Sequence, residues 1–191
     1  MKNKKFFIGL MVIALIFGLS GSVWAAVAVD DTVGLQVDTI HLIAITASDE
    51  DLLISDIGST AGLIPADSTG EKFAYLKYTT LVGGDSGVIS YKITALLDKA
   101  PPLGTELQVK TTIGAAGSGS QGTGIEAFTT IPIDFTTALD VVTTIPSCYT
   151  GTGGTDGAKV AYKLVVSDFS ALVPVATSDM TITYTIQDAT S

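Results

Sequence analysis

The chain has 191 residues and a formal net charge of −9, and all ten of its basic residues are lysine. A nucleic-acid-binding protein needs a basic face to neutralise phosphates, and this acidic composition predicts none. The single cysteine cannot form a disulfide within the chain, which excludes a small disulfide-stabilised fold. There is one long apolar run, at the N-terminus, and a multi-helix membrane protein would need several.

The N-terminal segment has the layout of a secretory signal peptide. Met1–Lys5 is basic, Phe6–Leu19 is apolar and uncharged, and small residues follow. This order predicts export, with cleavage after Ala25 or Ala28. We therefore expect a secreted, extracellular or cell-surface protein, with the periplasm as a further possibility.

Cleavage would leave one domain, residues 29–191, after a signal peptide at residues 1–28. The alternative is an uncleaved anchor, because Phe6–Val29 has no charged residue and is long enough to span a membrane. Once the signal is removed, we expect no contact with membrane or nucleic acid.

The remaining sequence favours strands over helices. It holds 26 threonines, all after residue 30, and charged residues make up only 15% of the chain. Threonine is β-branched and prefers a pleated, half-buried surface. Apolar and polar residues alternate with period two, as in antiparallel strands with one wet face, in Val88–Leu97, Glu106–Ile113, Val160–Ser167 and Met180–Gln187.

Weaker strand signals bring the total to about nine strands. They lie in Val33–Ile45, Leu52–Ile57, Phe73–Val82, Phe128–Phe135 and Leu139–Ile145. Two packed antiparallel sheets bury such faces most simply, so we predict an all-β fold: an antiparallel β-sandwich, immunoglobulin-like or Greek-key, behind the N-terminal signal helix. A small β-barrel is the alternative.

Two glycine-rich motifs resemble catalytic or cofactor signatures. Gly84-Asp85-Ser86-Gly87 matches the nucleophile tetrapeptide of trypsin-like proteases, but the only histidine, His41, lacks a typical motif around it. We interpret the tetrapeptide as a hairpin turn between its two flanking strands, and His41 as a packed or edge-strand residue. The G-x-G-x-x-G run Gly117–Gly122 has no helix after it, so we interpret it as a flexible surface loop. No catalytic residue emerges, and we predict that the protein is not an enzyme.

The densest acidic cluster is the one candidate metal site. Oxygen-rich loops on secreted β-sandwiches can bind Ca²⁺, and the candidate ligands are Asp49, Glu50, Asp51 and Asp56. The spacing does not match an EF-hand, and a solvated acidic turn needs no metal. We expect no other cofactor. Cys148 borders an apolar segment, so we predict a buried thiol.

The C-terminal strand carries a family resemblance. Met180–Asp188 alternates strictly up to a few residues from the chain end, and Ser147–Gly151 precedes a glycine-rich loop. With export and acidity, this pattern resembles secreted bacterial surface or pilin-like proteins with an immunoglobulin-like sandwich. The chain lacks the cysteine pair of chaperone–usher pilins. The resemblance implies a structural or adhesive role with itself or other surface proteins as partners.

An edge-strand mechanism would suit that role. Unpaired edges of a sandwich accept strands from neighbours, and Val33–Ile45 and Met180–Gln187 are candidate edge or exchange strands because of their terminal positions. We therefore expect a non-catalytic exported protein that self-assembles through edge strands. The alternative is a secreted binding module for a glycan, a small ligand or Ca²⁺.

Overall fold

The structure, a computed structural model, describes residues 40–47, 52, 54, 72–83, 87–175 and 179–189. These residues belong to one compact unit, Asp38–Ser191. The predicted signal peptide lies outside the described residues, and so does most of the weak strand candidate Leu52–Ile57.

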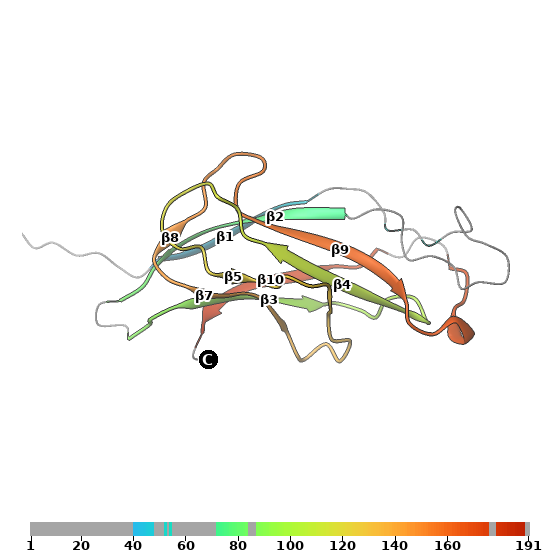
Figure 1. The fold of residues 1–191 in the computed structure, drawn as a ribbon. Coiled ribbons are helices and arrows are strands. Elements are labelled where there is room, and N and C mark those ends of the chain that lie inside the picture. Colours follow the sequence, from blue (N-terminus) through green and yellow to red (C-terminus); the bar gives the residue numbers. More distant parts are fainter. Residues whose placement is uncertain are drawn as a thin grey trace, which may run out of the picture. The chain divides into compact units, whose positions relative to one another are not determined.

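Two antiparallel sheets, which do not close into a barrel, form the described part of the chain (Figure 1). Sheet A has the order β1-β2-β9-β4-β6, with β8 also paired to β2, and sheet B has the order β10-β3-β7-β5. The predicted all-β sandwich is confirmed, and the barrel alternative is wrong. Sheet A comprises β1 (Ile40–Ala47), β2 (Lys72–Leu81), β4 (Thr105–Thr112), β6 (Thr129–Thr130), β8 (Cys148–Tyr149) and β9 (Ala158–Val166). Sheet B comprises β3 (Tyr91–Leu97), β5 (Thr123–Gly124), β7 (Leu139–Ile145) and β10 (Ile182–Asp188).

The four strictly alternating segments all form strands, with ends shifted by a few residues. Phe128–Phe135 does so only at β6. Beyond β6 the chain reaches Pro132, which has no backbone N–H for a ladder, and Phe135, whose φ is 56°. The sequence did not predict β5 and β8, two-residue strands too short to show a period.

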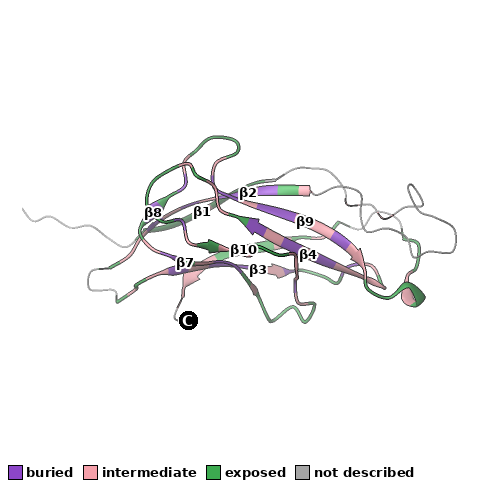
Figure 2. Cartoon of the chain, viewed as in Figure 1, coloured by how far each residue is buried: buried purple, intermediate pink, exposed green. Residues whose placement is uncertain are grey.

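The core lies between the inner faces of the two sheets. In β2, β3 and β4 buried residues alternate with more exposed ones along most of each strand (Figure 2). Leu76, Ile93 and Val109 are completely buried, and each such side chain contributes about 1.5–3 kcal/mol through removal from water. A polar contact joins the two sheets: the hydroxyls of Tyr162 and Tyr184 lie 2.7 Å apart, linking β9 of sheet A to β10 of sheet B.

The predicted hairpin between β2 and β3 is wrong, because the two strands belong to opposite sheets. A glycine turn is present: the Gly83 N–H donates to the Val88 carbonyl at 2.9 Å, and Gly83 and Gly87 have φ of 104° and 71°. The turn carries the chain from one layer of the sandwich to the other. Residues 84–86, within the protease-like tetrapeptide, lie outside the described residues.

The loop Gly117–Gly122 lies at the surface, as predicted, with residues 117–120 exposed, and it is hydrogen-bonded to the sandwich. Ser118 forms two backbone hydrogen bonds with Tyr149, at 2.9 and 3.1 Å. A Cβ on Gly117 would lie 1.9 Å from the Tyr149 carbonyl oxygen, and one on Gly122 would lie 2.5 Å from that of Thr143. The glycines therefore serve close backbone approach.

Candidate binding surfaces

Among the strands of the described residues, each sheet has one long and one short edge strand. The long edges are β1, with eight residues, and β10, with seven, whereas the opposite edges, β6 and β5, have two residues each. The strands β1 and β10 also contact each other, so both long edges lie on the same side of the sandwich. Each of the two segments predicted as edge strands, Val33–Ile45 and Met180–Gln187, therefore overlaps a long edge strand.

Strand β1 lacks the features that usually protect a sheet edge. Its sequence, IHLIAITA, contains no charged residue, proline or glycine, and its register with β2 runs without a bulge from Ile40 to Ala47. Leu42 is 64% exposed and Ile45 is 49% exposed. Natural edge strands are typically short, charged, bulged or interrupted by proline. Within the described part of the chain β1 pairs with β2 alone, so its other side is available to a further strand.

His41 lies in this edge strand, which agrees with one of the two roles predicted for it. It is paired in register with Thr80, a buried residue of β2, so its side chain is on the inner face. Its ring centroid lies 5.5 Å from that of Tyr91 on β3. Burial and then the charge of Asp188 raise the pKa of Tyr91. The contact anchors β1 to the other sheet.

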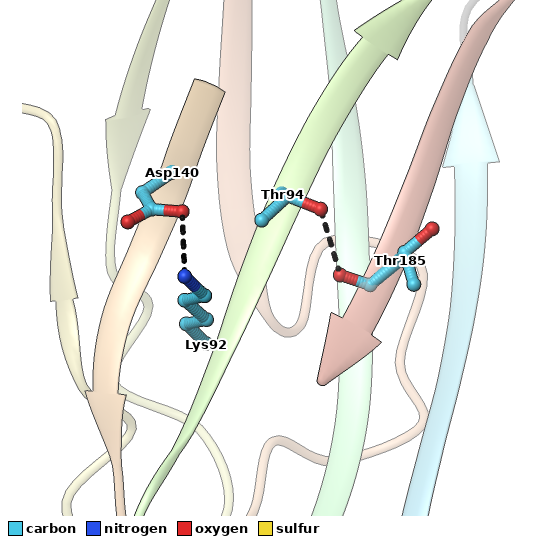
Figure 3. A network of polar contacts seen from close by, with 4 residues as sticks. All are labelled: Lys92, Thr94, Asp140 and Thr185. Atoms are coloured by element: carbon cyan, nitrogen blue, oxygen red, sulfur yellow. Dashed lines mark hydrogen bonds and ion pairs between the residues drawn. The ribbon is translucent and has the colours of Figure 1, made fainter. Parts of the chain in front are cut away.

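Side-chain contacts tie β3 to both of its neighbours in sheet B (Figure 3). The Lys92 Nζ lies 3.6 Å from Asp140 Oδ1 on β7, and the Thr94 hydroxyl donates to the Thr185 carbonyl on β10 at 3.4 Å. A partly exposed ion pair of this kind contributes about 0–1 kcal/mol. These contacts help to hold β10 at its edge.

The outer face of sheet A gathers four lysines, which we call the lysine row: Lys77, Lys159, Lys110 and Lys163. Lys159 is paired in register with Tyr75, two residues before Lys77 on β2. On its other side, Lys110 of β4 is paired with Ala161, midway between Lys159 and Lys163. Side chains two residues apart share a face of a strand, so successive members of the row are diagonal neighbours.

Three of these ammonium groups contact uncharged groups. Lys159 Nζ lies 4.0 Å from the centroid of the Phe73 ring, and Lys110 Nζ lies 5.9 Å from that of Phe128. Lys77 donates to the Thr152 carbonyl at 3.3 Å. Glu106 is the carboxylate on the described strands of this face, and its Oε2 accepts from the Thr130 hydroxyl at 2.8 Å.

The lysine row corrects the expectation that the chain has no basic face. Its members are spread from position 77 to position 163, so neither the composition nor a local sequence pattern reveals it. It depends on the pairing of β2, β9 and β4, which sequence periodicity does not determine.

The other predicted site residues have different outcomes. The calcium candidates Asp49, Glu50, Asp51 and Asp56 all lie outside the described residues. Among the residues that are described, no three histidine, cysteine or acidic side chains gather as a metal site. Cys148 is buried, as predicted, with its Sγ 3.4 Å from the Thr80 hydroxyl.

Comparisons with known proteins add no relative to this picture. No family model matches the chain, and no curated protein or solved structure shows significant similarity to it. In the described part of the chain, no helix has the length and apolarity to cross a membrane. The surfaces themselves therefore carry the functional argument.

Proposed function

We propose that this protein is a non-catalytic, exported structural or adhesive surface protein that assembles with itself through edge strands. The observation that carries the proposal is β1: a regular, uncharged, eight-residue edge strand with exposed apolar side chains. Such an edge offers unpaired backbone donors and acceptors to an extended strand of another copy.

The pairing partner decides the kind of assembly. If β1 pairs with β1 of a second copy, the contact is isologous and closes as a dimer. If β1 pairs with β10, the contact is heterologous and extends as a chain of subunits. The opposite edges, with two residues each, offer too few backbone groups for either arrangement.

The charge of the molecule explains why the uncharged strand suits this role. A net charge of −9 makes two copies repel each other at long range. Strand β1 brings no charge into the contact, so its backbone hydrogen bonds and apolar side chains form without burying an ion.

Light scattering coupled to size-exclusion chromatography tests the proposal on the exported form of the protein, from which the predicted signal peptide has been removed. We expect assemblies larger than one chain for the unchanged protein. Leu42→Lys places a charge on the exposed side of β1 and should weaken assembly about tenfold or more. Leu103→Lys is the matched control, because Leu103 is 71% exposed in the loop between β3 and β4.

Each outcome decides the proposal. If the unchanged protein remains monomeric at every concentration and salt level, the proposal of self-assembly is overturned. Assemblies that both variants weaken equally, or that neither weakens, overturn the role of β1. Thermal unfolding of the two variants should stay close to that of the unchanged protein, because both positions are exposed.

A further inference from the structure

We infer that the lysine row, with the neighbouring aromatic residues Phe73 and Tyr75, binds an acidic polysaccharide, a sugar polymer with anionic groups repeated along its chain. This site lies on the outer face of sheet A, whereas assembly is proposed at the sheet edge. The inference stands independently of edge assembly.

The register of sheet A sets the spacing of the positive charges. The row runs from Lys77 on β2 to Lys159 on β9, then to Lys110 on β4 and back to Lys163 on β9. Diagonal neighbours in an antiparallel sheet lie roughly 7–8 Å apart. The lysine positions therefore form a zigzag across three strands, which matches a polymer with repeated charges better than a single small anion.

Charge complementarity favours an anionic partner for this face. The described strands place four lysines and one carboxylate, Glu106, on the outer face of sheet A. The described neighbours of Lys77, Lys110 and Lys159 are a carbonyl and two aromatic rings. An anionic polymer would bring negative charge to these three ammonium groups.

Aromatic side chains beside the row favour a sugar polymer. Phe73 is 38% exposed, and its ring lies 6.3 Å from that of Tyr75 in an edge-on arrangement. Both residues are on the outer face, because their partners in β9 are Ala161 and Lys159. Aromatic rings offer an apolar surface to the C–H faces of sugar rings, while the Tyr hydroxyl bonds to water or sugar.

The absence of arginine favours many weak contacts over tight recognition of a single anionic group. Arginine binds carboxylate and phosphate alike through two parallel hydrogen bonds, and it dominates where such recognition is needed. This chain has none. Lysine acts as a point charge, and a row of point charges suits an anionic chain that is held through many weak contacts.

Isothermal titration of the full chain with polygalacturonate tests the inference, with dextran, a neutral polysaccharide, as the reference. We expect binding to polygalacturonate and none to dextran. Lys110→Gln with Lys159→Gln should weaken that binding about tenfold or more. Lys92→Gln with Lys99→Gln is the matched control, because it removes the same charge from positions outside the row, and it should change affinity less than twofold.

Two further titrations separate a sugar site from a general anion site. Polyglutamate and single-stranded DNA carry dense negative charge without carboxylated sugars, and Tyr75→Ser removes an aromatic ring without changing charge. We expect weaker binding of both polymers than of polygalacturonate, and a loss of polygalacturonate affinity in the Tyr75 variant. Equal or tighter binding of polyglutamate or DNA, an unaffected Tyr75 variant, or equal losses in both lysine pairs would overturn the inference.

Salt distinguishes this site from the assembly surface. Binding of an anionic polymer to lysines weakens as salt rises. The row variants should leave the light-scattering profile unchanged, and Leu42→Lys should leave polysaccharide affinity unchanged. Failure of polysaccharide binding and failure of assembly can therefore be distinguished from each other.

Discussion

Asp134 shows how a single side chain fixes a loop at the level of individual atoms. Its carboxylate accepts hydrogen bonds from the Thr136 and Thr137 N–H groups, at 3.0 and 2.7 Å, and from the Thr137 hydroxyl at 2.5 Å. Chiefly through the Thr137 bonds, the pKa of Asp134 falls from its usual 3.8 to about 2. The same turn holds the next residue, Phe135, at a φ of 56°, which is rare for a residue with a side chain.

The Asp134 pKa leads to a prediction about acid. Because this pKa is lower in the folded chain than in the unfolded chain, the ionised carboxylate stabilises the fold above about pH 4. That contribution is lost as the pH falls toward 2. Thr137→Val should raise the pKa toward 3.8, which a carbon-detected NMR titration of the carboxyl group measures. Thr129→Val, the same change at a half-buried position of strand β6, is the control. An unchanged pKa in the Thr137 variant would contradict the assignment.

Cys148 allows a second prediction at this scale. The residue is only 7% exposed, and its thiol neighbours the Thr80 hydroxyl, so a bulky thiol reagent should modify it only after unfolding. Moving the thiol to the exposed position before it, with Ser147→Cys in a Cys148→Ser chain, should give rapid labelling of the folded protein. Mass spectrometry after timed labelling measures both. Rapid modification of native Cys148 would show that the side chain is accessible.

At the scale of elements, packing explains which parts of the fold the sequence predicts. Strands such as β3 and β4 carry an alternating pattern because one face packs in the core and the other meets water. Strands β5 and β8 carry none, because two residues cannot show a period. Which strand pairs with which depends on contacts between residues far apart in the sequence, and local periodicity does not reveal them. For this reason the sequence wrongly predicted a hairpin between β2 and β3 and did not predict the lysine row.

The glycine loop provides the prediction for this scale. Gly117 has a φ of 91°, and a Cβ there would overlap the Tyr149 carbonyl. Gly117→Ala should therefore destabilise the fold by about 1–3 kcal/mol, which a shift in the urea midpoint measures. Gly154→Ala is the matched control, because Gly154 has open space around its Cβ position, and it should be close to neutral. Equal effects of the two changes would mean that the loop is not packed as described.

At the scale of the whole molecule, the net charge opposes contact between copies, whereas the edge strand β1 favours it. A net charge of −9 repels a second copy, and dissolved salt screens this repulsion over about 8–10 Å at moderate ionic strength. The proposed pairing through β1 involves backbone groups and apolar side chains, which salt does not weaken in the same way.

Assembly should therefore strengthen as salt rises. We expect the mean mass from light scattering to increase between about 20 mM and 500 mM sodium chloride at fixed protein concentration, because the Debye length shortens over this range. The Leu42→Lys variant should show a much smaller increase. A mass that falls with salt would mean that attraction between opposite charges, such as the lysine row and acidic groups of another copy, holds the assemblies.

Hydrogen exchange of β1 tests the central claim, assembly through this edge, most directly. About half of the amides in an edge strand point away from its single partner. On the full chain, exchange followed by mass spectrometry should show the peptide covering Ile40–Ala47 becoming protected at high salt and high protein concentration, while β9, which is paired on both sides, changes little. Equal exchange of β1 under assembling and dilute conditions would contradict assembly through this strand.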